Sequence, residues 1–232
     1  MAKLHSTNYS EKKLQEYTLY FKCNYGADFR PNQGLDELTD MIFLCSKNGT
    51  WVDLGGGTST FIWLPAFKEI TNVSSVDKYA ESFLVQEHNR IMRPSGCYRH
   101  ILERYQKSND DMRKIQITFS RVDLFKEFTA DKLYDNVSQF GLLGLCKNEG
   151  EYIYQLEKMT EFMHNDSVFL GANWKFSSLY EEKCGFSNSY LNVALIEKYA
   201  LNSGKALLYA KKVSIADDPY YTDVILYAFQ LK

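Results

Sequence analysis

The feature that most constrains the fold is an apolar segment that runs directly into consecutive glycines. Residues 50–54 (TWVDL) read as a short strand, the glycines 55–57 follow at once, and Thr58 and Ser59 come next. Glycine adopts backbone conformations that other residues avoid, and without a Cβ it lets a ligand approach the chain closely. Hydroxyl side chains are typical of a helix N-terminus. The pattern therefore predicts a strand, a tight turn and a helix over 58–67, with room for a ligand at the turn.

Strand-like and helix-like segments alternate along the rest of the chain. Apolar residues at helical spacing predict helices over 9–25, 34–47, 79–92, 149–164 and 188–201. Strands are expected over 73–77, 115–124, 133–140, 168–172, 206–215 and 224–231, and a polar, partly helical connection covers 94–114. The alternation of strands and helices implies a parallel sheet that helices cover on both faces. The two consecutive strands at the C-terminal end of the chain imply an antiparallel addition at one end of this sheet. We predict an α/β fold with a doubly wound, Rossmann-like, seven-stranded sheet, mostly parallel with an antiparallel C-terminal strand.

Composition limits the function classes. The 232 residues are expected to form a single domain, with 1–48 as N-terminal lid helices and 49–232 as the core. A formal net charge of −2 argues against a protein that coats nucleic acid. The apolar runs are far shorter than the roughly 20 residues that span a bilayer, so no membrane segment is expected. We predict a monomer or homodimer that acts on a small molecule.

Cysteine and histidine usage points to the cytoplasm and away from metal chemistry. The five cysteines are an odd number without a CxxC pair, and no signal peptide precedes them, which is typical of reduced thiols in a cytoplasmic protein. The four histidines do not fall at ligand spacing with one another or with cysteines. No metal site is expected.

Acids close three successive strands of the predicted sheet. Asp53 ends the first, Asp77 the second and Asp123 the third, and ligands of such sheets bind at the carboxyl ends of the strands. An acid before the glycines suits an ammonium group, a carboxylate at Asp77 can accept from both ribose hydroxyls, and Asp123 can accept from an adenine amine. Together these groups indicate S-adenosylmethionine, although each acid can also act as a structural helix cap.

Two other nucleotide-binding motifs fit poorly. A dinucleotide fingerprint requires a third glycine where this chain has Thr60, and the acid at Asp53 would repel a pyrophosphate. The sequence also has no GK[ST] run, which excludes a P-loop.

At these motifs the chain resembles the class I S-adenosylmethionine-dependent methyltransferases, over roughly residues 50–170. Their three motifs are matched by VDLGGGTS, SSVDKY and SRVDLF. The resemblance implies that Asp53 orients the methionine part of the cofactor, Asp77 holds the ribose and Asp123 faces the adenine. The cofactor-binding residues it implies in these motifs are Asp53, Gly55, Gly57, Asp77, Lys78 and Asp123.

A looser resemblance is to the nicotinamide, phenylethanolamine and indolethylamine N-methyltransferases. It rests on a tyrosine-bearing N-terminal helix, on the long connection at 94–114, and on the residues that follow the fifth strand. That group has an acid, a Ser-Ser, a tyrosine and a Phe-Ser there, whereas this chain has Asn173, Ser177-Ser178, Tyr180 and Phe186-Ser187. Asn173 replaces the acid, so the recognition of an amine by charge is not implied.

The catalytic candidates are Tyr25, Asn173 and Tyr180, with no general base required if the acceptor is a free nucleophile. Tyr17, Tyr20 and Tyr25 of the N-terminal helix can surround the sulfonium of the cofactor, since aromatic faces attract cations, or they can pack between helices. Asn173 and Tyr180 are expected just beyond the fifth strand, where an acceptor would be held, although Asn173 can equally cap a turn.

The sequence is also compatible with two functions other than methyl transfer. The same cofactor supports aminocarboxypropyl transfer with release of methylthioadenosine, and a catalytically silent partner subunit could keep the cofactor motifs. Residues 134–140 (YDNVSQF) lack the Asn-Pro-Pro-Tyr of methyltransferases that modify amino groups of bases, which disfavours a nucleic-acid substrate.

Overall fold

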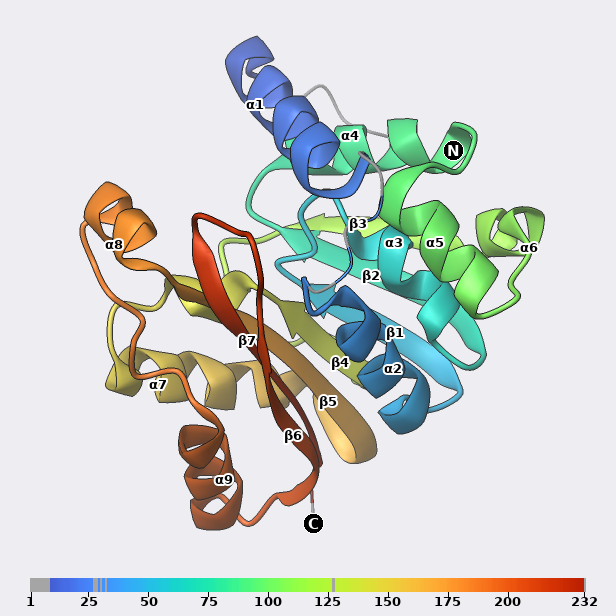
Figure 1. The fold of residues 1–232 in the computed structure, drawn as a ribbon. Helices are drawn as coiled ribbons and strands as arrows, with labels where there is room; N and C mark the ends of the chain where they lie inside the picture. Colours follow the sequence, from blue (N-terminus) through green and yellow to red (C-terminus); the bar gives the residue numbers. More distant parts are fainter. Residues whose placement is uncertain (1–8, 27–28, 30, 32, 127, 232) are drawn as a thin grey trace.

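A seven-stranded sheet with the strand order β3-β2-β1-β4-β5-β7-β6 forms the centre of the molecule (Figure 1). The computed structural model describes residues 9–26, 29, 31, 33–126 and 128–231. The strands are β1 (Gly49–Leu54), β2 (Ile70–Asp77), β3 (Gln116–Arg121), β4 (Tyr134–Phe140), β5 (Met163–Phe176), β6 (Ala206–Ser214) and β7 (Tyr221–Gln230). Strand β7 is antiparallel to both of its neighbours, and the pairs on the other side of β5 are parallel. The predicted α/β fold is confirmed.

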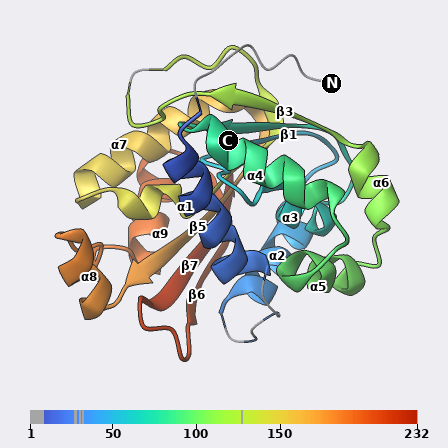
Figure 2. The ribbon, with the colours of Figure 1, turned by 90° about the horizontal axis from the view of Figure 1, so that it is seen from above.

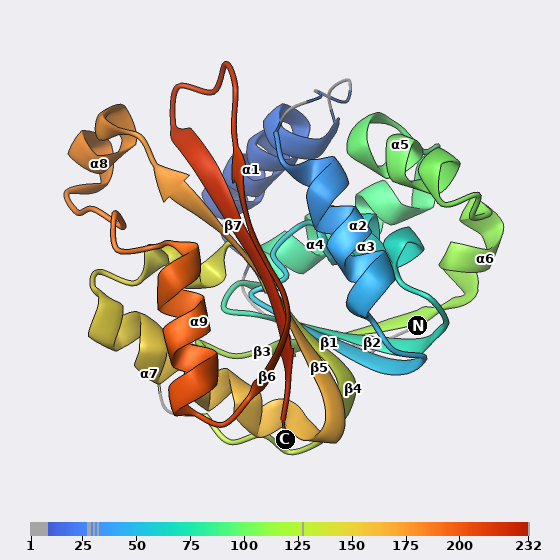
Figure 3. The same cartoon turned by 60° about the horizontal axis from the view of Figure 1, so that its bottom comes forward.

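Helices cover both faces of this sheet. They are α1 (Glu11–Phe21), α2 (Leu35–Cys45), α3 (Thr60–Trp63), α4 (Ala80–Ile91), α5 (Gly96–Arg104), α6 (Asn109–Lys114), α7 (Glu149–Met159), α8 (Ser178–Cys184) and α9 (Val193–Asn202). Figures 1 and 3 show α2, α3 and α5 on one side of the sheet and α7 and α9 on the other. Each side has its own buried apolar cluster, so both faces of the central strands are removed from water.

The N-terminal helix lies above the carboxyl ends of the strands. Its chain continues from α1 into a single π-helical turn, Lys22–Gly26, and residues 9–26 are called the lid below. Figure 2 shows α1 alongside α4, where the Ser10 backbone N–H donates to Glu81 Oε1 at 2.9 Å. The Tyr17 and Tyr79 rings meet there, with 6.0 Å between their centroids. None of the helices within the described ranges is long and apolar enough to cross a membrane.

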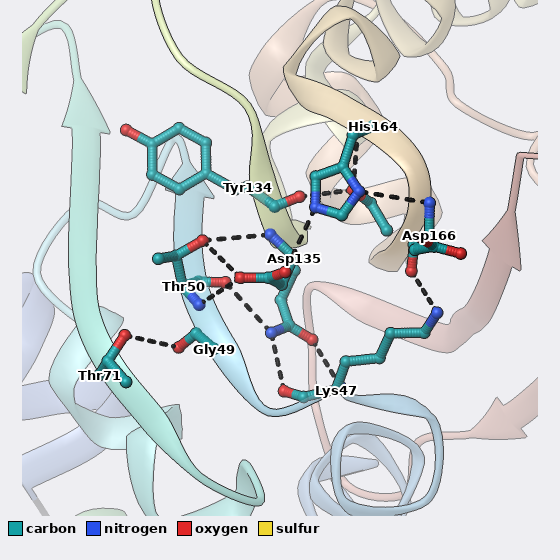
Figure 4. Close-up of polar contacts among 10 residues, drawn as sticks. Lys47, Gly49, Thr50, Thr71, Tyr134, Asp135, His164 and Asp166 are labelled. Atoms are coloured by element: carbon teal, nitrogen blue, oxygen red, sulfur yellow. Dashed lines mark hydrogen bonds and ion pairs between the residues drawn. The ribbon is translucent and has the colours of Figure 1, made fainter.

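At the opposite, amino end of the sheet a polar cluster ties β1, β4 and β5 together (Figure 4). The Thr50 backbone N–H and hydroxyl donate to Asp135 Oδ2 at 2.7 and 2.8 Å. His164 Nε2 lies 3.3 Å from the other oxygen of that carboxylate, and Lys47 Nζ donates to the Asp166 carbonyl. Although burial acts to raise the pKa of Asp135, the hydrogen bonds from Thr50 and His164 hold it below its usual value. This cluster fixes the register of β1, β4 and β5 at the amino end of the sheet, and it does not contact the carboxyl end.

Replacing Asp135 by alanine is expected to lower the free energy of unfolding by about 1–3 kcal/mol, because a backbone N–H and a hydroxyl lose their acceptor. The pKa of Asp135 is lowered in the fold, so this contribution is present above pH 4 and disappears as the pH falls through the folded pKa. Urea unfolding at pH 7 and pH 3 measures it. Thr71→Val is the control: its exposed hydroxyl donates to the Gly49 carbonyl at 3.3 Å, and a change below about 0.5 kcal/mol is expected. Equal losses in the two variants would contradict this role for Asp135.

Several predicted boundaries differ from the structure. Strand β5 runs from Met163 to Phe176 rather than over 168–172, so the expectation that Asn173 lies just beyond it is wrong. The helix expected over 58–67 is reduced to α3 and a 3-10 turn, because Pro65 lacks the N–H that would continue an α-helix. Strand β3 ends at Arg121, which leaves Asp123 in the loop after it. The helix expected from residue 188 begins at Val193, where Asn192 accepts from the Leu195 backbone N–H.

Candidate functional site

A cavity of about 530 Å³ opens at the carboxyl ends of the strands, beneath the lid. Its walls come from the loops after β1, β2, β3 and β4, from the end of β5, from the lid and from the segment that joins β6 to β7. The loops after parallel strands converge at one edge of a doubly wound sheet, which is where such folds hold their ligands.

The glycines after β1 form the floor of the cavity, and their backbone geometry requires glycine. Gly55 and Gly57 both have left-handed backbones, with φ of +76° and +53°. A Cβ on Gly55 would lie 2.7 Å from Leu142, whereas a Cβ on Gly57 would have no protein atom closer than 3.8 Å. Both glycines line the cavity. A side chain at position 57 would therefore meet no protein atom closer than ordinary van der Waals distance.

Asp53 lies beneath this turn and does not line the cavity. Its side chain is buried, with Oδ2 accepting from the Thr60 hydroxyl at 2.8 Å and Oδ1 from the Ser138 hydroxyl at 2.7 Å. The Trp51 indole N–H donates to the same Ser138 oxygen at 2.8 Å. Burial raises the pKa of Asp53 to about 6, although the two hydroxyl hydrogen bonds act in the opposite direction. The glycine turn thus lies above the buried carboxylate of Asp53, which is ionised at neutral pH.

Asp77 lies at the end of β2 and does line the cavity. Its Oδ2 accepts from the Gly57 backbone N–H at 3.1 Å and its Oδ1 from the Tyr79 backbone N–H at 2.9 Å. Burial raises the pKa of this carboxyl, and these hydrogen bonds oppose the rise. Asp77 therefore joins the glycine turn to the loop after β2 and keeps its orientation fixed.

Lys78 and Asp123 face each other across the cavity edge. Lys78 Nζ lies 3.2 Å from Asp123 Oδ2, and both residues line the cavity. Partial burial acts to raise the pKa of Asp123, but the Lys78 ammonium holds it below its usual value. The structure thus brings Asp77, Lys78 and Asp123, the candidate residues of the second and third motifs, to one cavity.

The three predicted lid tyrosines all line the cavity. Tyr25 lies between the Tyr20 ring, at 6.0 Å, and the Trp63 ring, at 5.8 Å between centroids. Tyr20 is half exposed and stands at the mouth. Tyr17 contacts Tyr79, next to the Asp77 side of the cavity. The lid tyrosines therefore pack against neighbouring rings and also line the cavity.

Another part of the cavity lining is an aromatic wall, made of Trp174, Phe176, Tyr180 and Tyr221. The Phe176 ring meets Tyr180 edge to face at 4.7 Å, and Tyr180 lies 5.5 Å from Tyr221. The Ser177 backbone N–H and hydroxyl, both donating to carbonyls of the segment before β7, hold these elements together.

An acidic residue, Asp218, lines the cavity together with the aromatic wall. Asp218 Oδ1 accepts from the backbone N–H groups of Tyr220 and Tyr221 at 2.8 and 3.1 Å, which fixes its carboxylate at the cavity. Among the lining residues within the described ranges the charged ones are Asp77, Lys78, Asp123 and Asp218. Asp77 ends β2, and Lys78 and Asp123 lie in the loops after β2 and β3, so Asp218 is the charge beside the aromatic wall.

Asn173 does not reach the cavity. It is fully buried inside β5, where its Oδ1 accepts from Gln139 Nε2 at 3.0 Å and from the Tyr152 hydroxyl at 3.1 Å. The hydroxyl of Tyr227 lies 3.4 Å from the same oxygen. Gln139 Oε1 in turn accepts from the Leu143 backbone N–H, in the loop that lines the cavity. The expectation that Asn173 contacts an acceptor directly is corrected: the residue supports the wall from behind.

Among the lining residues that no sequence pattern singles out are Thr58, Trp174, Phe176, Asp218 and Tyr221. A strand extended to residue 176 would have placed Trp174 and Phe176 on one face, because side chains two apart share a face. Thr58 is also typical of a helix N-terminus, and Asp218 is typical of a turn. Neither carries a local signal for ligand binding.

No protein-family model matches the sequence, and no curated protein matches it. Solved structures do match. The N-methyltransferase NodS of Bradyrhizobium japonicum, in complex with S-adenosylhomocysteine, has a TM-score of 0.60 and 9% identity over 95% of this chain and 97% of that one. Magnesium protoporphyrin IX methyltransferase of Synechocystis with bound S-adenosylmethionine has a TM-score of 0.56 and 14% identity over 97% and 100%.

A third match is to the complex between a methyltransferase activator of Haloferax volcanii and a putative methyltransferase, with a TM-score of 0.60 and 13% identity over 93% of each chain. At such identities the similarity establishes the fold. The chain has the architecture that these S-adenosylmethionine-dependent methyltransferases share.

Proposed function

We propose that the protein transfers a methyl group from S-adenosylmethionine to a nucleophilic nitrogen, or to an oxygen or sulfur, of a small molecule. The observation that carries this proposal is the convergence of the glycine turn, Asp77 and the Lys78–Asp123 pair on one cavity, at the strand ends of a methyltransferase fold. The solved structures of that fold include complexes with S-adenosylmethionine and S-adenosylhomocysteine.

The residues of the cavity suit this cofactor in size and chemistry. The open Cβ position of Gly57 leaves room for a ligand against the backbone, and the Asp77 carboxylate beside it can accept from ribose hydroxyls. Asp123 can accept a hydrogen bond from the adenine amine when its ion pair with Lys78 opens. The buried charge of Asp53 favours an ammonium group above the turn. Tyr17, Tyr20 and Tyr25 close the cavity from the lid.

S-adenosylmethionine supplies an electrophilic methyl group on a sulfonium, and the protein's task is to align the acceptor and exclude water. Tyr25 and Tyr180 both line the cavity and are the catalytic candidates that touch it. The aromatic wall suits a flat or cationic acceptor. Asp218 supplies the negative charge that the sequence lacks at Asn173, which favours an acceptor that carries a positive charge in solution. The nitrogen that is methylated reacts in its unprotonated form, after its proton has passed to solvent, because only a free lone pair can attack the methyl group.

Thermal unfolding with S-adenosylmethionine, S-adenosylhomocysteine and NADH in separate samples tests the cofactor. A ligand at 100 times its dissociation constant stabilises the fold by about 2.7 kcal/mol, which for a chain of this size raises Tm by several degrees. We expect a rise with both adenosyl ligands and none with NADH. A rise with NADH alone, or with none of the three, would overturn the proposal.

Product analysis separates the two chemistries that this cofactor supports. Methyl transfer releases S-adenosylhomocysteine, and aminocarboxypropyl transfer releases methylthioadenosine. Screening small amines and pyridines against the protein should yield S-adenosylhomocysteine. A protein that binds the cofactor but releases neither product with any acceptor would instead be the silent partner subunit that the sequence left open.

A further inference from the structure

The first helix of the lid, α1, packs mainly against α4 (Figure 2). Phe21, at its end, is the one buried residue of α1, and the other side chains of this helix are exposed or partly exposed. A helix that buries so little apolar surface has a low local stability, and its 11 residues are too few to persist as a helix in water alone. The contacts between α1 and α4 therefore decide whether the lid stays in place.

At the start of α1 the lid is bound by the carboxylate of Glu81. The Ser10 backbone N–H, at the N-cap of α1, donates to Glu81 Oε1 at 2.9 Å. Glu81 itself belongs to the first turn of α4 and is 7% exposed. A helix N-terminus carries about half a positive charge, so this carboxylate lies where two such ends meet. Burial acts to raise the pKa of Glu81, but the Ser10 N–H and the cations of Arg121 and Lys13 hold it below its usual value, and the group is ionised at neutral pH.

Two further contacts join the same elements and reach the cavity. Lys13 Nζ lies 4.2 Å from the centroid of the Tyr79 ring, and the centroid of the Tyr17 ring is 6.0 Å from it. Tyr17 and Tyr79 line the cavity, whereas Glu81 does not. We call Ser10, Lys13 and Tyr17 of the lid, together with Tyr79 and Glu81 at the start of α4, the clasp. Movement of α1 away from α4 would separate Tyr17 from Tyr79 and open the cavity wall there.

Because Glu81 lies outside the cavity lining, it stabilises the docked lid to the same extent with and without a ligand. A group with no preference between these two states changes how often the lid opens, but it leaves the equilibrium affinity almost unchanged. We propose that Glu81 is a positioning residue that keeps the lid docked and thereby sets the rates at which the cofactor enters and leaves the cavity. This inference rests on the proposed function for the identity of the ligand, and it assigns a role to a residue outside the cavity.

Hydrogen–deuterium exchange of the protein alone tests the clasp directly. Glu81→Gln keeps an oxygen that can accept from the Ser10 N–H but removes the charge, and a hydrogen bond to a charged group is roughly twice as strong as a neutral one. We expect the backbone amides of α1 to exchange about fivefold faster in this variant, with no change in the amides of the central strands. Lys13→Met removes the cation over the Tyr79 ring and keeps a chain of similar length, so it should raise the exchange of α1 about twofold.

Stopped-flow mixing with S-adenosylhomocysteine gives the second readout. In Glu81→Gln the association rate and the dissociation rate should both rise about fivefold, while the dissociation constant stays within about twofold of the wild type. Glu87→Gln is the matched control, because Glu87 lies on the same helix and pairs with Arg90 of that helix rather than with the lid. Its lid exchange and both of its rates should equal those of the wild type.

Unchanged exchange and unchanged rates in Glu81→Gln would overturn the inference. Faster exchange throughout the central strands, with a lower Tm, would also overturn it, because Glu81 would then serve only as a stabilising charge at the start of α4. A faster dissociation rate with a proportional loss of affinity would mean that Glu81 acts only on the bound state, contrary to the inference. A wild-type protein that does not bind S-adenosylhomocysteine would overturn the proposed function, whereas the exchange measurement needs no ligand and would still decide the role of Glu81.

Discussion

A Gly57→Ala variant is expected to lose at least about thirtyfold in affinity for S-adenosylhomocysteine while remaining folded. An alanine at a left-handed φ of +53° costs about 1–2 kcal/mol. The protein itself has space for the added Cβ, whose nearest atom would be the Gly55 carbonyl at 3.8 Å. The methyl group would instead fill the part of the cavity where the cofactor is proposed to pass the backbone.

Gly204→Ala is the matched control for this variant. Gly204 also has a left-handed backbone, with φ of +67°, no atom within 4 Å of its Cβ position, and no place in the cavity lining. It should show the same conformational cost and unchanged affinity. Gly55→Ala should be less stable than either, because its Cβ would lie 2.7 Å from Leu142. Calorimetry and urea unfolding of the three variants measure both effects. Unchanged binding in Gly57→Ala would remove the glycine turn from the proposed site.

The strand-end acids could be predicted because their positions depend on a short local pattern. Each of Asp53, Asp77 and Asp123 directly follows a valine at the end of a strand-like segment, and the carboxyl ends of parallel strands meet at one edge. The sequence could not show that Asp53 faces inward beneath the turn while Asp77 lines the cavity. That difference depends on Thr60 and Ser138, which provide buried hydroxyl partners for one carboxylate and not for the other.

Strand β5 shows why boundaries are harder to predict than elements. Its apolar run stops at Ala172, and the polar Asn173 and Lys175 that follow are typical of a loop. The strand continues because β7 pairs with it in antiparallel register, with Asn173 opposite Ile225 and Lys175 opposite Asp223. A neighbouring strand that lies about 50 residues later in the chain decides the boundary, and no local pattern contains it.

The surroundings of Asn173 and Asp218 depend on contacts that the sequence alone does not show. The hydrogen-bond partners of Asn173 are 34, 21 and 54 residues away along the chain. These contacts exist only in the assembled sheet. Asp218 belongs to a turn between two strands, where an acid is ordinarily explained by turn geometry. Its importance follows from the aromatic wall beside it, to which β5, α8 and β7 each contribute.

An Asp53→Asn variant is expected to be more stable than the wild type at pH 7.5, and the difference should vanish in acid. The pKa of Asp53 rises from 3.8 to about 6 on folding, which corresponds to about 3 kcal/mol. The folded state binds more protons than the unfolded state between these values, so Asp53 makes the fold less stable as the pH rises from about 4 to 6. Asparagine carries no charge and avoids this cost. Thr60 can accept from the new amide because its hydroxyl can donate to Ser75, 3.0 Å away.

Urea unfolding at pH 7.5 and pH 3 measures this difference, for which we expect about 1–3 kcal/mol at the higher pH. A costly buried charge implies a function, and the proposed one is to attract the ammonium of the cofactor. The variant should therefore bind S-adenosylhomocysteine about tenfold more weakly at pH 7.5, and the wild type should itself lose affinity as Asp53 is protonated through pH 6. Methylthioadenosine, which lacks the ammonium, should show neither effect. If both ligands lose affinity together, Asp53 supports only the shape of the turn and the cost of its charge has another cause.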